Sequence, residues 1–266
     1  MRVLLARPPR RDPLDAGLCV PPLGLAYVGA ALREAGHRVE ILDALALDWS
    51  WARFEAGLAA RRPDVLGLSA MTPMVDVAAR AARLGRPHAR HVVLGGPHPT
   101  AVRHAIFDEI PQLDAAVVGE GERVAQALLG WWEGGEVEAP PAGVLVRGQP
   151  VIESEPERDP GRLPWPARDL LPNHAYRYLF ATRPGFATMI TSRGCPFACT
   201  FCDKSVGGSR WRARQPADVV DEMEELVRRY DVGFINFYDD NFTLRRERVV
   251  GMRRQRGVRD PFDRLV

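Results

Sequence analysis

The sequence predicts an α/β protein whose N-terminal part is a doubly wound parallel sheet. Short apolar runs alternate with segments of helical spacing through the first half of the chain. The runs are continuously apolar, as expected for strands that helices cover on both faces. The same alternation returns after a proline-rich stretch, which indicates a second α/β unit.

The composition is that of a globular chain with room for one large domain or two modest ones. Of the 266 residues, 46% are hydrophobic and 26% are charged, and the formal net charge is +2. This balance gives no global attraction to nucleic acid or membranes. No apolar run approaches the roughly 18 residues of a membrane span, and the apolar start is too short for a signal peptide. We therefore expect a cytoplasmic protein with no membrane span and no nucleic-acid partner.

Five strands and four helices are predicted in the first half. The expected strands are Arg2–Ala6, Val39–Leu42, Val65–Ser69, His91–Leu94 and Ala115–Val118. The expected helices are Gly24–Ala35, Trp51–Ala60, Val75–Leu84 and Glu122–Trp132. Each helical segment stops close to a glycine or a proline, the residues that most often terminate helices.

A hairpin and a linker are predicted next. The hairpin joins Gly143–Arg147 to Pro150–Glu153 through a turn at Gly148-Gln149. Residues 154–186 lack periodicity and are rich in proline. We interpret them as an interdomain linker between a domain over 1–153 and a second domain over 187–266. The second domain is expected to begin with a strand, a helix and a strand, at Ala187–Thr191, Pro216–Arg229 and Phe234–Tyr238.

Ligands of a doubly wound sheet bind outside the carboxyl ends of its strands. The loops expected there are Pro8–Leu23, Ser69–Pro73, Gly95–Thr100 and Gly119–Gly121. Their glycines allow the backbone to approach a flat, bulky ligand. The first strand leads to Arg7-Pro8-Pro9-Arg10 and not to G-x-G-x-x-G, which disfavours a nicotinamide-binding domain.

Three cysteines, Cys195, Cys199 and Cys202, form a C-x3-C-x2-C pattern after the predicted strand of the second domain. Thiolates select iron–sulfur clusters, zinc or Cu(I). A fourth thiolate is absent nearby; a structural zinc site normally has four ligands, whereas a catalytic 4Fe–4S cluster can use an open iron. The alternatives are a zinc site completed by Cys19 or Asp203, and cysteines that pack as small hydrophobes.

At these residues the sequence resembles the radical S-adenosylmethionine (radical SAM) enzymes, whose signature also has an aromatic residue before the last cysteine, here Phe201. The resemblance implies that the three cysteines hold a 4Fe–4S cluster whose open iron chelates S-adenosylmethionine. Phe197 and Phe201 would keep water away from the cluster. It further implies the first part of a β/α radical SAM barrel, a small-molecule substrate, and an external electron donor such as flavodoxin or ferredoxin.

The string Asp239-Asp240-Asn241-Phe242-Thr243 follows the second strand of this unit. Radical SAM enzymes with an N-terminal cobalamin domain often carry a similar D-D-x-F-T string. The resemblance therefore implies that Asp239 and Asp240 lie on the S-adenosylmethionine side of the site, together with Phe201. The alternative is that the two carboxylates cap the N-terminus of a helix.

The N-terminal half resembles a Rossmann-like, cobalamin-binding domain in three strings. They are Pro21-Pro22-Leu23-Gly24-Leu25, Gly95-Gly96-Pro97-His98 and Gly119-Glu120-Gly121-Glu122. The resemblance implies cobalamin as a further cofactor. Its expected contacts are Ser69, Thr72, Gly95, Gly96, Pro97, His98, Gly119, Glu120 and Gly121.

The sequence lacks the D-x-H-x-x-G string whose histidine ligates cobalt in many cobalamin domains. We therefore expect cobalt to have no protein histidine ligand. The loop Ser69–Pro73 or the loop that contains Cys19 could face the metal instead. The alternative for His98 is a turn residue whose side chain bonds to the backbone.

The end of the chain is rich in arginine, and the apolar spacing of a sheet-covering helix largely disappears beyond Val250. By resemblance, a radical SAM barrel has more strand–helix units than this chain supplies. We therefore expect a C-terminally truncated enzyme that cannot complete a catalytic cycle alone. The resemblance implies radical C-methyl transfer by the full-length protein. A radical cyclase or ring-rearranging enzyme of tetrapyrrole or other secondary metabolism and a non-catalytic cobalamin-binding module are the alternatives.

Overall fold

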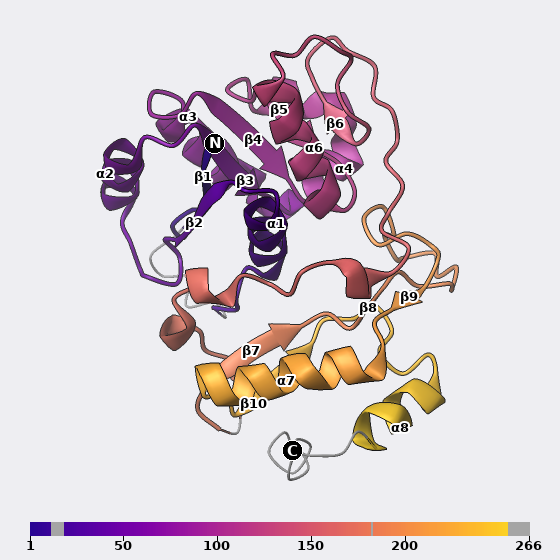
Figure 1. The fold of residues 1–266 in the computed structure, drawn as a ribbon. Coiled ribbons are helices and arrows are strands. Elements are labelled where there is room, and N and C mark those ends of the chain that lie inside the picture. Colours follow the sequence, from indigo (N-terminus) through magenta and orange to yellow (C-terminus); the bar gives the residue numbers. More distant parts are fainter. Residues whose placement is uncertain (12–18, 182, 255–266) are drawn as a thin grey trace.

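The computed structural model describes residues 1–11, 19–181 and 183–254. The N-terminal half forms a six-stranded sheet, and a smaller α/β unit follows it in the chain (Figure 1). Part of the predicted loop Pro8–Leu23 and the last part of the arginine-rich tail lie outside the described residues. Among the helices of the described ranges, none combines the length and apolarity needed to cross a bilayer.

The sheet confirms the predicted doubly wound topology. Its strand order is β2-β1-β3-β4-β5-β6, with parallel neighbours except for the antiparallel pair β5 and β6. The order reverses at β1, so β1 and β3 form the switch point beside which such sheets bind ligands. The strands are β1 (Arg2–Arg7), β2 (Arg38–Asp43), β3 (Val65–Ser69), β4 (His91–Gly95), β5 (Ala115–Val117) and β6 (Val144–Leu145).

Helices cover both faces of the sheet because successive strand residues point to opposite sides. Val3 and Leu5 of β1 share a buried cluster with residues of α1 and α6, whereas Leu4 and Ala6 pack with residues of α2 and α3. Each face therefore has its own core. The covering helices are α1 (Leu23–Glu34), α2 (Trp51–Arg61), α3 (Val75–Gly85) and α6 (Gly121–Glu133).

The structure has short helices between β3 and β6 that the sequence does not predict. They are η1 (Thr72–Met74), α4 (Pro97–Val102), η2 (Arg103–Ala105) and α5 (Ile106–Glu109). Proline is tolerated in the first turn of a helix, which suits the start of α4. Ile106 and Phe107 are buried in the core, so tertiary packing holds a helix too short to show a periodic pattern.

The predicted hairpin is present only as a turn. Gly143 N donates to Ile152 O at 2.7 Å, and Gln149 N donates to Val146 O at 3.1 Å. However, residues 150–153 form no strand, and β6 pairs with β5 instead. Val144 and Leu145 are buried at that edge of the sheet, whereas Pro150 has no N–H to donate to a strand.

The C-terminal unit contains β7 (Phe186–Met189) and β10 (Phe234–Phe237), which pair in parallel. The helix α7 (Pro216–Tyr230) connects them, as predicted. The predicted strand Ala187–Thr191 is too long by two residues at its end, because the chain leaves the sheet and forms a second short strand. That strand, β8 (Ser192–Arg193), pairs antiparallel with β9 (Arg212–Ala213).

One more helix, α8 (Arg246–Arg254), packs against α7. The helix continues through Gly251 to Arg254, although the apolar spacing of a sheet-covering helix largely disappears beyond Val250. Met252 is buried in the core of the C-terminal unit, and Arg248 is buried as well. Tertiary burial of these two side chains thus outweighs the weak helical pattern of an arginine-rich segment.

Residues 154–186 run between the two units (Figure 1) and bond to both. Ala167 N donates to Ala26 O of α1 at 3.0 Å, and Arg168 donates to Thr188 O of β7 at 2.7 Å. This segment includes three short helices, η3 (Pro160–Arg162), η4 (Arg168–Leu170) and η5 (Asn173–Ala175).

Candidate functional site

A cavity of about 360 Å³ opens at the carboxyl ends of the N-terminal strands. Its inner wall is apolar and lies between the sheet and the helices α1 and α6. Strand residues such as Leu5 and Val117 form one side of this wall, and helix residues such as Val28 and Leu128 form the other. Residues of the C-terminal unit complete the opposite wall: Ile190, Ser192, Arg193, Val206, Gly207, Tyr238 and Asp240.

Most of the residues predicted to contact cobalamin line this cavity. They are Ser69, Gly95, Gly96, Pro97, Gly119, Glu120 and Gly121. Thr72 and His98 are not among the lining residues. The cavity therefore brings together three loops that are far apart in the sequence, as the parallel topology predicts.

His98 is buried and bonds to two side chains. Its Nδ1 lies 3.1 Å from Thr72 Oγ1, and its Nε2 lies 2.8 Å from Glu109 Oε2. The alternative in which the side chain bonds to the backbone is therefore wrong. The side chain bonds to Glu109 because the helix α5 places this carboxylate beside the His98 ring. With both ring nitrogens engaged, His98 has none left for a metal.

Gly96 makes the turn from β4 into α4 at the cavity mouth. Its φ is +101°, a backbone conformation that L side chains rarely adopt. A Cβ at this position would lie 2.7 Å from Ser69 Oγ and 2.9 Å from Ala70 O. The glycine is thus required both by conformation and by space.

We expect Gly96→Ala to lower the free energy of unfolding by about 1–3 kcal/mol, because it adds backbone strain and a close contact. Urea denaturation of the chain measures this effect. Gly130→Ala is the control, since Gly130 lies in α6 with no atom within 4 Å of an added Cβ. Alanine there should leave stability unchanged or raise it by up to about 1 kcal/mol. Equal losses in both variants would contradict the role of Gly96.

The cysteine loop, residues 194–211, lies between β8 and β9. Cys195 is half-buried, and Cys199 and Cys202 are exposed. The base of the loop is closed by Cys195 N, which donates to Gly208 O at 3.2 Å. Within the described residues, no three His, Cys, Asp or Glu side chains group as metal ligands. The fold thus brings the three cysteines into one loop without gathering their thiols around a point.

Both alternatives for the cysteines are disfavoured. Cys19 is buried against Leu171 and Tyr176, and burial, with Asp43 nearby, raises the pKa of its thiol, which opposes the thiolate that a metal needs. Asp203 accepts hydrogen bonds from the Ser205 N–H and hydroxyl, each at 2.9 Å. Both features disfavour a zinc site completed by Cys19 or Asp203. Cysteines that merely pack as hydrophobes would be buried, and two of the three are exposed.

Asp239 and Asp240 hold the junction between β7 and the cysteine loop. Asp239 accepts bonds from Thr191 N at 2.7 Å and from the Thr191 and Ser192 hydroxyls at 2.6 Å. Asp240 accepts a bond from Gly194 N at 2.9 Å and lines the cavity. The helix-capping alternative is wrong, because α8 starts only at Arg246.

The two phenylalanines beside the cysteines are exposed. Phe197 is 52% exposed and Phe201 is 91% exposed. Large exposed apolar side chains next to three thiols offer cover for a bound group. The chemistry of the loop, soft donors flanked by apolar rings, therefore fits an iron–sulfur cluster.

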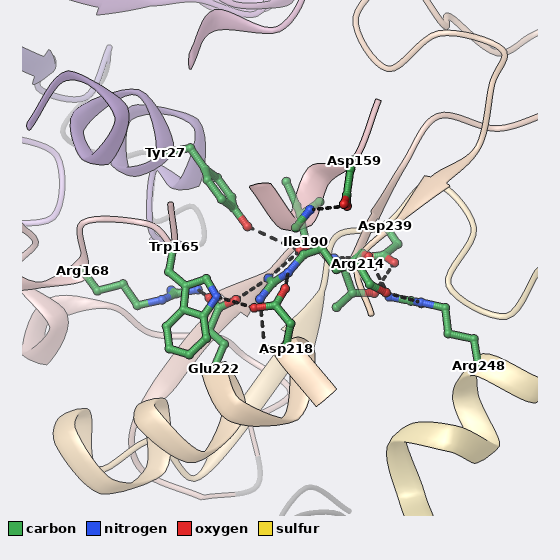
Figure 2. A network of polar contacts seen from close by, with 12 residues as sticks. Tyr27, Asp159, Trp165, Arg168, Ile190, Arg214, Asp218, Glu222, Asp239 and Arg248 are labelled. Carbon is green, nitrogen blue, oxygen red and sulfur yellow. Dashed lines mark hydrogen bonds and ion pairs between the residues drawn. The ribbon is translucent and has the colours of Figure 1, made fainter. Parts of the chain in front are cut away.

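A buried polar network joins residues 154–186 to α7 (Figure 2). Glu222 of α7 accepts a bond from Arg168 Nη2 at 2.8 Å and a short bond from Arg214 Nη1. Arg214 Nε also donates to Asp218 at 2.6 Å, and Trp165 Nε1 donates to the same carboxylate at 2.8 Å. Arg168, Arg214 and Glu222 are each at least 95% buried. Arg168 therefore depends on Glu222 for compensation, whereas Arg214 pairs with both Glu222 and Asp218.

Tyr27 of α1 connects this network to the cavity, which it lines. Its hydroxyl donates to Ile190 O at 3.4 Å (Figure 2). Burial, with the charge of Glu222 nearby, raises the pKa of Tyr27 well above its usual range, so the phenol stays protonated as a donor. The Arg193 guanidinium lies 5.1 Å from the centre of its ring.

Two family models match the chain in the order that the sequence predicts. The B12 binding domain model matches residues 14–129, and the Radical SAM superfamily model matches residues 189–262. The first range includes the loops of the cavity mouth, and the second includes the cysteine loop. The chain belongs to the cobalamin-binding radical SAM family. The predicted family and α/β fold class are both confirmed.

Known relatives of this radical SAM protein differ in their reactions. An uncharacterized methyltransferase of Pyrococcus horikoshii is 34% identical over 94% of this chain and 56% of the relative. An anaerobic magnesium-protoporphyrin IX monomethyl ester cyclase of Rubrivivax gelatinosus is 31% identical over 86% of this chain and 43% of the relative. The chain thus spans about half the length of the curated relatives it matches.

The fold is similar to that of TsrM, a radical S-adenosylmethionine methyltransferase from Kitasatospora setae solved with cobalamin and a 4Fe–4S cluster bound. The TM-score is 0.74 at 21% identity, over 99% of this chain and 53% of that chain. The likeness extends over both units of this radical SAM protein, and so over both walls of the cavity.

Sequence reasoning missed several polar residues of this site. Arg193 stands two residues before Cys195, and Glu122 stands two residues after Glu120, yet no local pattern gives either a role. Arg168 and Glu222 have no local pattern that separates them from surface charges. The one available signal is Arg212 and Arg214, which alternate directly before α7 as inward-facing residues of an extended segment would.

Proposed function

We propose that this chain is the cofactor-binding part of a radical SAM enzyme whose full-length form transfers a methyl group to an unactivated carbon of a small molecule. The observation that carries the proposal is the cavity, whose walls combine the cobalamin-domain loops with Val206 and Gly207 of the cysteine loop. A large apolar cavity with a polar mouth suits a bulky cofactor. The methyltransferases among the relatives support methyl transfer.

The residues present fit each proposed cofactor. Cys195, Cys199 and Cys202 would hold a 4Fe–4S cluster, with one iron left to bind S-adenosylmethionine. Gly95, Gly96, Gly119 and Gly121 line the cavity, and glycines allow the backbone to approach the edge of a ligand such as cobalamin closely. When bound, the cluster supplies the electron that cleaves S-adenosylmethionine, and cobalamin carries the methyl group. The chain itself positions both cofactors, with Asp239 and Asp240 holding the strand ends between them.

We also propose a cobalt centre without a protein histidine ligand. Among the described residues that line the cavity there is no histidine, and the ring nitrogens of His98 are both engaged. Ser69 lines the cavity at the end of β3 and is exposed, so the loop Ser69–Pro73 would face the metal of a bound cobalamin. In the Co(II) form, the electron paramagnetic resonance spectrum should lack nitrogen splitting from a protein imidazole.

Cobalamin retention tests the cavity assignment. Ala125 of α6 is 8% exposed and lines the cavity, so Ala125→Trp should fill the space and abolish retention of hydroxocobalamin on gel filtration. Ala127→Trp is the matched control, because Ala127 is exposed on the same helix. Circular dichroism establishes that both variants fold. Equal retention by two folded variants would overturn the cavity as the cobalamin site.

A radical cyclase is the second candidate, because a cyclase is 31% identical to this chain. The two reactions differ in their balance of products. A methyltransferase releases S-adenosylhomocysteine for each methyl group taken from S-adenosylmethionine, whereas a cyclase forms 5′-deoxyadenosine without it. Product analysis of the full-length form after anaerobic incubation with dithionite and S-adenosylmethionine distinguishes them.

The surroundings of the cysteine loop support an external electron donor such as flavodoxin or ferredoxin. Cys199, Cys202 and Phe201 are exposed, so a protein donor could approach the cluster side directly. Exposed free thiols also suit a reducing compartment, and we place the protein in the cytoplasm. In this proposal, residues 154–186 separate a cobalamin domain over 1–153 from a radical SAM domain over 187–266.

A further inference from the structure

Two carboxylates of the cavity mouth bind two arginines that flank the cysteine loop. Arg212 of β9 reaches Glu120 with two bonds, Nη2 to Oε1 at 2.7 Å and Nη1 to Oε2 at 3.1 Å. Arg193 of β8 donates to Glu122 at 2.6 Å and lies 3.5 Å from Glu120. We call these four residues the interdomain latch. Two-bond arginine–carboxylate pairs are among the strongest and most directional polar contacts.

The latch is shielded from solvent and balanced in charge. Its four side chains are between 3% and 12% exposed. Each guanidinium lies close to a carboxylate: Arg193 is 2.6 Å from Glu122, and Arg212 is 2.7 Å from Glu120. Removing one partner would therefore leave an uncompensated charge in a poorly solvated place. Contacts of this kind hold two units in one relative position.

The latch reaches the base of the cysteine loop through the backbone. Arg212 Nη2 also donates to Gly207 O at 3.0 Å. Gly207 in turn packs against Gly194, where a Cβ would lie 2.7 Å from Gly207 O. Arg193 directly precedes this glycine, two residues before Cys195. Glu120 thus connects to both ends of the loop that carries the three cysteines.

The same carboxylates belong to the cavity wall. Glu120 and Glu122 line the cavity, as do Gly119 and Gly121 between and beside them. Arg193 lies over the ring of Tyr27, which also lines the cavity. A group bound in the cavity therefore touches the segment that holds the cysteine loop.

We propose that Glu120 and Glu122 are positioning residues that hold the cysteine loop against the cavity, so that occupancy of the loop and occupancy of the cavity are energetically coupled. The identity of the two occupants rests on the proposed function, whereas the mechanical role of the latch does not. If the latch only stabilised the fold, its loss would affect the cysteine loop and the cavity independently of each other. Coupling of linked sites typically corresponds to about 5- to 150-fold in affinity.

The mechanical role is tested in the cofactor-free chain by hydrogen–deuterium exchange. Glu120→Gln keeps the shape of the side chain and removes its charge. We expect amides of residues 194–212 to exchange about tenfold faster, as follows from the loss of a charge-assisted bond, with little change in β1–β4. Glu153→Gln is the matched control, because Glu153 forms an exposed pair with Arg103 at 2.8 Å. Unchanged exchange over 194–212 in Glu120→Gln would overturn the latch, whatever the cofactors are.

The coupling is tested in the reconstituted chain. Cobalamin affinity is measured with and without the cluster, for the natural chain, Glu120→Gln and Glu153→Gln. We expect about a tenfold dependence on the cluster in the natural chain and in Glu153→Gln, and less than about twofold in Glu120→Gln. An equal dependence in all three, or none in the natural chain, would overturn the coupling. Failure to bind either cofactor would instead contradict the proposed function and leave the exchange result to decide the latch.

A conservative variant covers the case in which Glu120→Gln does not fold. Arg212→Lys keeps the positive charge but loses the planar, two-bond geometry. It should raise exchange over residues 194–212 in the same direction and weaken the dependence of cobalamin affinity on the cluster. Behaviour identical to that of the natural chain in both measurements would contradict a positioning role for the pair.

Discussion

Replacing Cys195, Cys199 and Cys202 together by alanine should abolish cluster binding by the anaerobically reconstituted chain. The three thiols are the soft donors of one loop, and iron–sulfur clusters require such donors. Within the described residues, no cluster of three or more His, Cys, Asp or Glu side chains offers a replacement site. Iron and sulfide content and the Mössbauer spectrum measure the effect, which we expect to be a complete loss of cluster iron.

Cys19→Ala is the matched control for this experiment. Cys19 is the one further cysteine of the chain, and it is buried between α1 and residues 171–176. Its loss should leave the iron content unchanged. Unchanged iron in the triple variant, or zinc as the only stoichiometric metal of the natural chain, would contradict the cluster assignment.

Glu222→Ala should lower the free energy of unfolding by about 3–5 kcal/mol, because it leaves the buried Arg168 and Arg214 without their shared carboxylate. Arg214 keeps Asp218, so Arg168 carries most of the penalty. Its guanidinium would keep the bond from Nη2 to the neutral Thr188 O, whereas its Nε is already buried with no hydrogen-bond partner among the described residues. Urea denaturation followed by circular dichroism measures the loss.

Glu225→Ala on the same helix is the control. Glu225 pairs with Arg229 at 3.1 Å, one turn further on, at the protein surface. Exposed pairs of this kind contribute about 0–1 kcal/mol, so we expect a small change. If both variants lose the same amount of stability, the buried network of Figure 2 is not a major determinant of stability.

The strand–helix order and the position of the cysteines could be predicted because both are local features. Strands β1 to β5 and helices α1, α2, α3, α6 and α7 lie within a few residues of their predicted ranges. Each depends on apolar spacing inside one short window. The predicted hairpin is wrong because strand pairing is not a local feature. Its turn is present, but Val144 and Leu145 pair with β5, almost 30 residues earlier in the chain.

The short helices α4 and α5 and the arginine-rich α8 could not be predicted in the same way. Each is held by a few buried side chains, such as Phe107 or Met252, and not by a periodic face. Their consequences for the site are large. The helix α5 brings Glu109 to His98, and α8 brings Arg248 to Thr191 O, 2.7 Å away.

The amino-acid sequence by itself determined the α/β class, the glycine-bearing loops at the strand ends and the three thiols of the cysteine loop. These features depend on the spacing of residues within short segments of the chain, and their chemistry does not depend on distant partners. Only the tertiary structure decided which charges meet. Glu120 and Arg212 are 92 residues apart, and Arg168 and Glu222 are 54 apart. A buried charge is stable only beside its partner, and that partner is specified by how the two units pack together, which no local pattern encodes.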